Sequence, residues 1–300
     1  MTAPASRYRT PEERFASLPG FPFEPRYREW QGLRLAHIDE GEGAPVVMLH
    51  GEPTWSYLYR KVIDPLLQAG HRCIAPDLPG FGRSDKPLSE GWYSYENHTL
   101  AIASLLDALD LRDVTLVMQD WGGPIGLRVA TMELPERVAR LVLMDTGVFD
   151  GRQRMSEGWH RFREFVERSP DVPIGVLIRG GCKSPPADEV VRAYEAPFPD
   201  RASKAGVRTF PALIPSSPDA PGATEGASVI AALRQERRPT LVMWGDSDPA
   251  LPLEPVGRLM AQLIPSAEEL RVIFDAGHYL QEDQGERLGA MIAEWLADEV

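Results

Sequence analysis

The stretch that decides the fold reads Val114-Thr-Leu-Val-Met-Gln-Asp-Trp-Gly-Gly-Pro-Ile-Gly-Leu-Arg-Val-Ala130. Its apolar run Val114–Met118 predicts a buried strand, and the two glycines that follow predict a tight turn. Pro124 then suits the first turn of a helix, where its missing N–H leaves no hydrogen bond unmade. The sequence therefore predicts a strand, a turn that carries Asp120, and a helix. Taken alone, Asp120 could also be the N-cap of that helix.

A carboxylate in such a turn has a particular chemistry. The arrangement resembles the strand–nucleophile–helix elbow of the α/β-hydrolases, which usually reads Gly-x-Ser-x-Gly. Asp120 stands here at the serine position. A carboxylate can attack a tetrahedral carbon and form an ester with it, whereas a serine is suited to acyl carbon. The resemblance therefore implies displacement of a leaving group rather than cleavage of an ester.

The composition excludes several classes of protein. Of 300 residues, 43% are hydrophobic and 25% are charged, which is typical of a globular domain with room for one inserted lobe. A net charge of −12 and the lack of a Lys/Arg-rich run argue against nucleic acid or an anionic membrane as a partner. No run is long enough for a membrane span or a signal core. Two cysteines are too few for a disulfide framework, so we expect a cytoplasmic protein with reduced thiols.

Short apolar runs recur along the chain and end in polar, turn-forming residues. Leu33–Ile38 alternates and predicts an early antiparallel strand, while the other runs predict parallel strands buried on both faces. Those runs are Pro45–His50, Arg72–Asp77, Val114–Met118, Leu141–Met144, Thr240–Trp244 and Leu270–Phe274. Helical stretches such as Tyr95–Leu109 lie between several of them. The predicted fold class is α/β, a doubly wound and mostly parallel sheet.

The alternation breaks once, between Met144 and Thr240. A structureless loop of about 95 residues is improbable in a compact domain. The segment contains proline-rich stretches and amphipathic pieces such as Trp159–Glu167. It is therefore interpreted as a helical cap over residues 150–232, inserted into a core made of residues 1–149 and 233–300.

The candidate catalytic residues follow the predicted strands. In such a sheet the active site lies at the carboxyl ends of the strands. A general base is expected late in the chain, and His278 is the one of the six histidines that lies between the last strand run and the last helix. His50, which follows an earlier strand, is expected to brace its loop instead.

The acid that would orient the histidine is less directly indicated. Asp248, in Gly245-Asp-Ser-Asp248, is the first choice, with Asp246 as a neighbour that shapes the turn. Asp145 competes with it because it also ends a strand run. Each of these residues could instead cap a helix or a turn.

Several segments together resemble one family, the haloalkane dehalogenases. They are His50-Gly-Glu-Pro-Thr-Trp-Ser-Tyr-Leu-Tyr-Arg60, Asp77-Leu-Pro-Gly-Phe-Gly-Arg-Ser-Asp-Lys-Pro87 and Gln119-Asp-Trp-Gly-Gly123. The first and third segments together are highly specific, whereas Gly80-Phe-Gly-Arg-Ser-Asp85 of the second is shared by many α/β-hydrolases. The cap segments Tyr194–Asp200 and Ala205–Pro211 also look like the branch whose acid follows the seventh strand. The likeness runs from about residue 20 to the C-terminus.

The resemblance implies a role for each matching residue. Asp120 would be the nucleophile, Asp248 the acid and His278 the base. Trp121 and, from the cap, Trp159 would hold the halide, and the backbone N–H groups of Glu52 and Trp121 would form the oxyanion hole. For Trp121 and Trp159 the alternative is an ordinary packing role.

The same resemblance implies the reaction and its partners. The substrate would be a small halogenated alkane, hydrolysed to alcohol, halide and a proton through an alkyl ester on Asp120. No metal or organic cofactor is implied, and no ligand cluster or phosphate-binding loop is recognisable. We expect a monomer.

Three other functions compete with this interpretation. Epoxide hydrolases share the fold and the aspartate nucleophile, but they need cap tyrosines, and the predicted cap contains only Tyr194. Fluoroacetate-type dehalogenases need cationic residues that grip a carboxylate, and no such pair is identifiable. A non-catalytic protein of this fold would tolerate loss of nucleophile, base or acid, whereas all three candidates are present.

Overall fold

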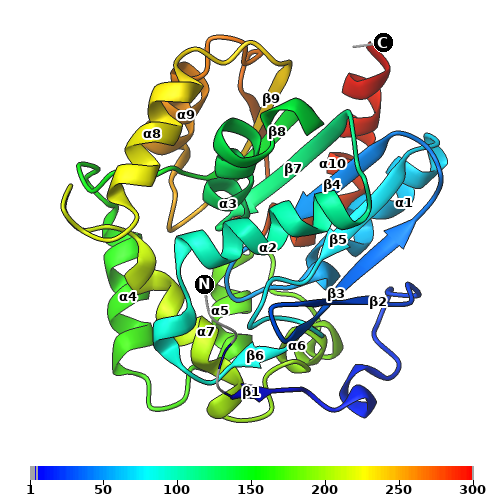
Figure 1. The fold of residues 1–300 in the computed structure, drawn as a ribbon, viewed down its shortest axis with the longest axis vertical. Coiled ribbons are helices and arrows are strands. Elements are labelled where there is room, and N and C mark those ends of the chain that lie inside the picture. The colour runs from blue at the N-terminus through cyan, green and yellow to red at the C-terminus, as the bar shows by residue number, and fades with distance from the viewer. Residues whose placement is uncertain (1–3, 5, 299–300) are drawn as a thin grey trace.

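The computed structural model describes residue 4 and residues 6–298, and within them an eight-stranded sheet forms the centre of the fold (Figure 1). The strand order is β10-β9-β8-β7-β4-β5-β3-β2. Strand β3 pairs antiparallel with both β2 and β5, and the other pairs are parallel. The predicted doubly wound, mostly parallel sheet is confirmed.

The elements have the following bounds. The strands of the large sheet are β2 (Arg26–Trp30), β3 (Leu33–Glu40), β4 (Pro45–Leu49), β5 (Arg72–Pro76), β7 (Val114–Asp120), β8 (Val138–Thr146), β9 (Thr240–Gly245) and β10 (Arg271–Ile273). A separate antiparallel pair is formed by β1 (Arg7–Tyr8) and β6 (Lys86–Pro87). The α-helices are α1 (Arg60–Gln68), α2 (Tyr95–Ala108), α3 (Gly122–Arg128), α4 (Glu157–Arg168), α5 (Ile174–Gly181), α6 (Asp188–Glu195), α7 (Ala205–Thr209), α8 (Ala223–Leu233), α9 (Arg258–Leu263) and α10 (Leu280–Asp298).

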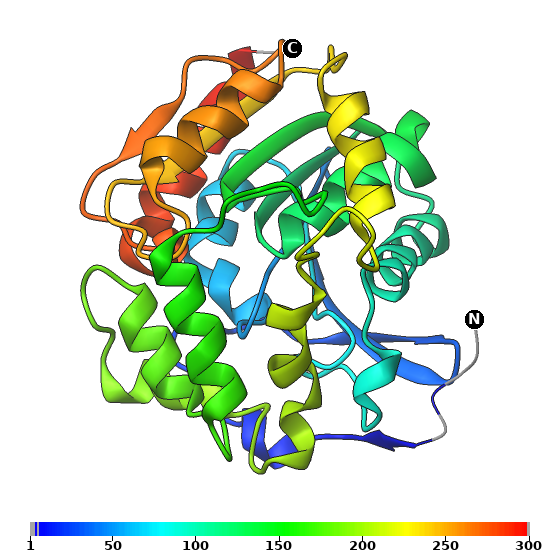
Figure 2. The same ribbon diagram turned by 90° about the vertical axis from the view of Figure 1, so that its left-hand side faces the viewer.

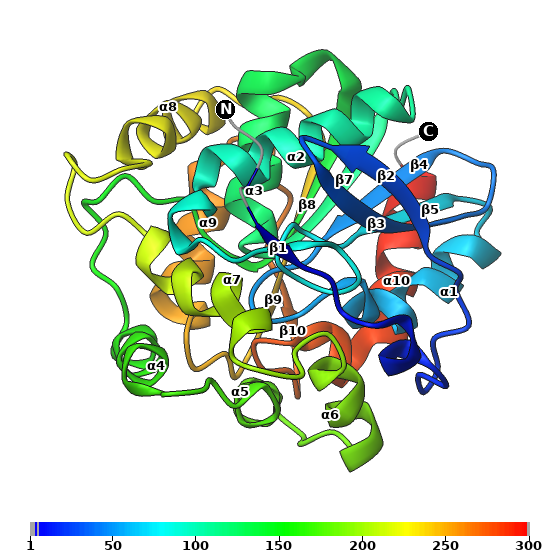
Figure 3. The ribbon, with the colours of Figure 1, turned by 60° about the horizontal axis from the view of Figure 1, so that its bottom comes forward.

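Every strand that the sequence predicts is present, and the runs of the central strands β4, β5, β7, β8 and β9 are almost entirely buried. The strand β2 was not predicted, and its exposed and half-buried residues explain why: it is an edge strand with one partner and no continuous apolar face. On opposite faces of the sheet, α1 packs against α10, and α3 packs against α2 and α8 (Figures 1 and 3).

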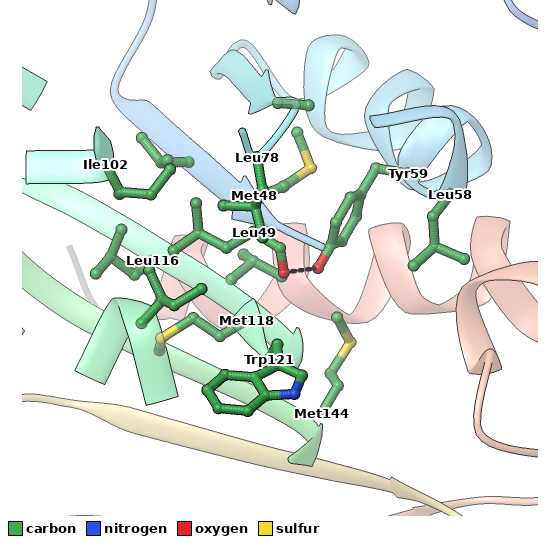
Figure 4. Close-up of a cluster of buried hydrophobic side chains, with 14 of the residues drawn as sticks. Met48, Leu49, Leu58, Tyr59, Leu78, Ile102, Leu116, Met118, Trp121 and Met144 are labelled. Carbon is green, nitrogen blue, oxygen red and sulfur yellow. Dashed lines mark hydrogen bonds between the residues drawn. The ribbon is translucent and has the colours of Figure 1, made fainter. Parts of the chain in front are cut away.

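The core is continuous across the middle strands. Met48 and Leu49 of β4 and Leu116 and Met118 of β7 lie in one cluster that reaches Trp121 beyond the end of β7 (Figure 4). In the same cluster the Tyr59 hydroxyl donates to the Leu49 carbonyl at 2.9 Å. The end of β7 is therefore fixed on a rigid, fully packed base.

The segment between β8 and β9 is helical and lies at one side of the sheet, at the carboxyl ends of the parallel strands (Figure 2). It contributes α4 to α7, while α8 returns to the core and packs against α3. An inserted cap at this position covers the edge where the candidate residues are expected. The cap boundaries at 150 and 232 stay a prediction.

Candidate active site

Asp120 occupies a sharp turn between β7 and α3. Its φ of +48° lies in the left-handed region, which is unusual for a residue with a side chain and is typical of strained turns at functional sites. The turn requires close contacts that only glycine permits, because a Cβ at Gly122 would collide with the Leu49 carbonyl and one at Gly123 with the Thr146 hydroxyl. The Thr146 hydroxyl in turn donates to the Asp120 carbonyl at 2.6 Å. The turn thus presents the Asp120 carboxylate at the sheet edge.

The two other catalytic candidates lie beside it. His278, in the loop between β10 and α10, places Nδ1 2.7 Å from Asp248 Oδ2 and Nε2 3.6 Å from Asp120 Oδ2. The other oxygen of Asp248 accepts hydrogen bonds from the N–H groups of Ala250 and Leu251, at 2.7 and 2.9 Å. The structure therefore brings Asp120, His278 and Asp248 together in the order that a nucleophile, a base and an orienting acid require.

The electrostatic environment favours a positive His278. Burial by itself would lower its pKa, but the carboxylates of Asp248 and Asp120 outweigh this effect and raise the pKa well above the ordinary value. Part of that stabilisation depends on the charge of Asp120. Any reaction that neutralises Asp120 would therefore lower the pKa of His278 and favour its unprotonated form, which can act as a base.

Asp145, the competing acid, lies in a different position. It is fully buried near the end of β8, with a φ of +34°, and its two oxygens accept from the Gly245 N–H at 3.2 and 3.1 Å. Burial, followed by the charge of Asp248, raises its pKa well above the ordinary value. Among the described residues, Asp248 rather than Asp145 is the carboxylate bonded to His278 Nδ1.

Two further candidates have structural contacts. Asp246 is exposed, and it accepts from the N–H groups of Asp275 and Ala276 and from the Ser247 hydroxyl, so it shapes the turn. His50 accepts from the Leu78 N–H at 3.0 Å, and its other ring nitrogen lies 2.9 Å from the Gly51 carbonyl. Both residues act on loop geometry.

Of the two predicted oxyanion donors, the N–H of Glu52 contacts the nucleophile directly. The backbone N–H of Glu52 donates to Asp120 Oδ1 at 2.8 Å. Trp121 is the residue before the first helical residue of α3, where a backbone N–H has no acceptor within the helix. A negative oxygen that develops on the Asp120 carboxyl would be stabilised by donors in these positions.

A cavity of about 410 Å³ lies over these groups, with Asp120 and His278 in its wall. The remaining wall is mainly apolar and comes from the core loops and the cap, including Phe149, Phe162, Phe165, Leu177, Ile214 and Leu251. Such a volume and lining fit a small apolar molecule with a few polar groups at one end.

Both predicted halide-binding tryptophans line this cavity. Trp121 follows Asp120, and Trp159 lies in the first turn of α4, which Ser156 caps by accepting from the Trp159 N–H at 3.0 Å. The two side chains are 6% and 7% exposed. Neither indole N–H donates to another group in the part of the chain that the structure describes, so both donors are free for a ligand.

Two side chains that the sequence reasoning did not use also line the cavity. Tyr279 follows His278 and is buried, and its hydroxyl lies 3.4 Å from the Glu52 carbonyl. The side chain of Glu52, of which the sequence analysis used only the backbone N–H, is only 4% exposed. The sequence could have indicated these two side chains only through their neighbours, since Tyr279 follows the predicted base His278 and Glu52 lies in the His50-Gly-Glu52 segment.

The described residues contain no group of three or more His, Cys, Asp or Glu side chains arranged to hold a metal ion. Within the same residues, no helix has both the length and the apolar character needed to cross a bilayer.

Comparison with known proteins gives a consistent result. Residues 44–284 match the model of the alpha/beta hydrolase fold family. A haloalkane dehalogenase from Psychrobacter cryohalolentis is 42% identical over 299 residues, with 97% of this chain and 98% of that protein covered. One from Mycolicibacterium paratuberculosis is 40% identical over 294 residues, with 96% and 97% covered.

Solved structures of haloalkane dehalogenases also resemble this chain. The tetrameric haloalkane dehalogenase DpaA from Paraglaciecola agarilytica superposes with a TM-score of 0.89 at 36% identity, covering 97% of this chain and 98% of that one. The haloalkane dehalogenase DatA from Agrobacterium tumefaciens gives a TM-score of 0.80 at 27% identity, with 97% and 100% covered. With its fold, its aspartate elbow and these relatives, the chain belongs to the haloalkane dehalogenases of the α/β-hydrolase fold.

Proposed function

We propose that Asp120 is the nucleophile, His278 the base and Asp248 the orienting acid of hydrolytic dehalogenation in this protein. The observation that carries the proposal is the connected geometry of the three groups: 2.7 Å from Asp248 to His278 Nδ1 and 3.6 Å from His278 Nε2 to Asp120. A merely capping aspartate would need neither a histidine nor an apolar cavity in front of it.

The first half-reaction forms the ester. An oxygen of Asp120 attacks the carbon that bears the halogen, the new C–O bond forms as the carbon–halogen bond breaks, and the bonding pair leaves with the halide. Trp121 and Trp159 donate their indole N–H groups to that halide. Because the charge on the halide develops only as the bond breaks, these donors stabilise the transition state more than the ground state.

The second half-reaction hydrolyses the ester. Water attacks the carboxyl carbon of Asp120 while His278 takes its proton, and Asp248 holds the imidazolium. The N–H groups of Glu52 and Trp121 stabilise the oxyanion. As this intermediate collapses, the bond between the Asp120 carboxyl carbon and the alkoxide oxygen breaks, His278 returns its proton to that oxygen, the alcohol leaves and the carboxyl of Asp120 releases the remaining proton. The sum is haloalkane plus water giving alcohol, halide and a proton.

The pKa of His278 changes between the two half-reactions. In the free protein the charge of Asp120 helps to raise that pKa. Ester formation removes this charge, so the pKa of His278 falls when a base is needed.

The experiment that tests the proposal uses His278→Ala. It should release one equivalent of halide from a bromoalkane and retain the alkyl group, detected by intact mass and located on Asp120 by peptide mapping. Asp120→Asn is the matched control and should gain no mass. A His278→Ala protein that binds substrate and stays unmodified would contradict the assignment of both residues.

Epoxide hydrolysis has less support. Tyr194, the cap tyrosine, is fully buried and donates to Glu282 at 2.8 Å, and it is absent from the cavity wall. Halide release from haloalkanes with no turnover of an epoxide panel is the expected result.

We further propose that the protein is cytoplasmic, which its low cysteine content and free cysteines support, and that it is a monomer. DpaA is a tetramer, so sedimentation velocity is the direct test. A concentration-independent monomer is expected.

A further inference from the structure

Asp283 is a carboxylate that the mechanism above does not use, and it holds two distant parts of the chain together. It lies in the first turn of α10, shortly after His278. Its Oδ2 accepts from the backbone N–H groups of Gly277 at 2.9 Å and Lys183 at 2.8 Å, and its Oδ1 accepts from the N–H of Ser184 at 3.0 Å. All three donors lie outside α10, so the carboxylate does more than stabilise the N-terminus of its own helix.

One of these donors belongs to the loop of the base, and the other two belong to the cap. Gly277 directly precedes His278, whereas Lys183 and Ser184 follow α5 in the segment between β8 and β9. Helix α5 supplies part of the cavity wall, including Leu177. The carboxylate therefore connects the loop of the base to one wall of the cavity.

The cap and the loop also meet without an intervening side chain. The N–H of Tyr279, on the other side of His278, donates to the Gly181 carbonyl at 3.3 Å. A Cβ at Gly277 would lie 2.3 Å from the same carbonyl oxygen, so the two backbones approach as closely as glycine allows. His278 is therefore flanked by two cap contacts, one through the Asp283 carboxylate and one through the N–H of Tyr279.

Small displacements of His278 matter for the chemistry. Its Nδ1 lies 2.7 Å from Asp248 and its Nε2 lies 3.6 Å from Asp120. The loop that carries it follows β10, a three-residue strand at the edge of the sheet that pairs with β9. A strand with so few ladder hydrogen bonds gives the following loop little support, and a displacement of about 1 Å in a catalytic group can cost about a hundredfold in rate. The loop therefore needs contacts beyond the sheet, and the cap supplies them.

We propose that Asp283 is a positioning residue for His278, which fixes the loop of the base to the cap through the N–H of Gly277. The proposal rests on the proposed function, because it takes His278 as the base of ester hydrolysis. A carboxylate suits this task, since its two oxygens can accept from several N–H groups at once. The seating of the cap and the placing of the base thus depend on the same side chain.

The test compares Asp283→Ala with Asp283→Asn in otherwise unchanged protein. Alanine removes all three acceptor contacts. Asparagine can place its amide oxygen on the N–H groups of Gly277 and Lys183, and it then loses only the bond from Ser184. Rapid-quench measurements with a bromoalkane give the rates of ester formation and ester hydrolysis separately, and unfolding in urea reports the stability of each variant.

Two further variants separate positioning from stability. Tyr194→Phe is the matched control, because it breaks another contact between the cap and α10, the 2.8 Å bond from Tyr194 to Glu282, which does not involve Gly277. Gly277→Ala leaves Asp283 in place and forces the loop away from the Gly181 carbonyl. This variant tests the same link if Asp283→Ala does not fold.

The expected result is selective. Asp283→Ala and Gly277→Ala should slow ester hydrolysis at least about tenfold, so that the alkylated protein accumulates, because His278 is displaced. Ester formation should stay within about threefold of the unchanged protein, since that step needs no base. Asp283→Asn should recover hydrolysis to within about threefold. The NMR signal of the His278 Nδ1 proton, which faces Asp248, should move in Asp283→Ala and keep its position in Tyr194→Phe.

Several outcomes would overturn the proposal. Equal slowing of both half-reactions in Asp283→Ala would indicate a general structural role, and unchanged hydrolysis would remove Asp283 from the positioning of the base. The same loss of hydrolysis in Tyr194→Phe would show that any weakening of the cap has this effect. Failure of Asp120 to become alkylated in His278→Ala is a separate result, which would refute the proposed function itself.

Discussion

Replacing Asp248 by asparagine tests the electrostatic core of the site. One oxygen of Asp248 accepts from two backbone N–H groups, those of Ala250 and Leu251, and the other accepts from His278 Nδ1. An asparagine would keep its carbonyl oxygen on the two backbone donors, so its NH₂ would face Nδ1. The imidazole would then carry its proton on Nε2 and could not take one from water.

The size of the effect follows from the 2.7 Å contact between Asp248 and His278. At an effective dielectric constant of about 20, an ion pair at that distance is worth at most about 6 kcal/mol. In serine proteases the equivalent change to asparagine, which fixes the wrong tautomer, lowers turnover about 10⁴-fold, or about 5.5 kcal/mol. We expect ester hydrolysis in Asp248→Asn to fall by about 10³- to 10⁴-fold.

Ester formation needs no base, so it should change far less. Stopped-flow halide release should show a burst of one equivalent followed by very slow turnover, and intact mass should show the alkylated protein. Asp145→Asn is the matched control: its amide oxygen can still accept from Gly245, so turnover should fall by no more than about fivefold, which is less than the loss of a full hydrogen bond to a charged group would cause. A larger loss in Asp145→Asn than in Asp248→Asn would refute the reasoning and transfer the orienting role to Asp145.

Three other predictions follow from particular contacts. Trp159→Phe removes a charge-assisted hydrogen-bond donor worth about 1.5–3 kcal/mol. Quenching of tryptophan fluorescence by bromide should weaken, and ester formation should slow about ten- to a hundredfold, more than ester hydrolysis. Unchanged halide affinity in the folded variant would mean that the second donor to the halide lies elsewhere. The rate of ester hydrolysis should fall as the pH drops through the pKa of His278. The midpoint of this pH–rate profile should lie below the midpoint of the His278 titration followed by NMR in the free protein, because the ester removes the Asp120 charge that raises this pKa. Coincident midpoints would argue that the charge of Asp120 does not affect the pKa of His278. Tyr194→Phe removes the hydrogen bond to Glu282 and should lower the free energy of unfolding in urea by about 1.5 kcal/mol, with kcat little changed; an unchanged unfolding midpoint would show that this link adds no stability.

The sheet was predictable because burial leaves a clear pattern in sequence. A parallel strand covered on both faces is mainly apolar, as in the Val114–Met118 part of β7, and each such run was recognised. The edge strand Arg26–Trp30 has no such requirement and left no pattern. The pair Arg7–Tyr8 and Lys86–Pro87 is too short for periodicity to act as a signal.

The catalytic candidates were predictable for a topological reason, since residues that follow parallel strands meet at one edge of the sheet. This rule brings Asp145 and Asp248 to the same edge and cannot choose between them. The choice depends on which carboxylate reaches His278 Nδ1, and that depends on the two backbone N–H groups that orient Asp248. The burial of the Glu52 side chain was unpredictable for a similar reason, because it follows from the cap and the loops that close over it.

Four acidic side chains lie near His278, those of Asp120, Asp248, Asp145 and Glu52. Burial raises the pKa of Asp145 and of Glu52 well above the ordinary value. A positive His278 between Asp120 and Asp248 balances part of their negative charge in the free protein. Esterification of Asp120 removes one negative charge, so the pKa of His278 falls. The charge of Asp120 is thus the variable that changes during the reaction, and its loss lowers the pKa of His278 at the stage when a base is needed.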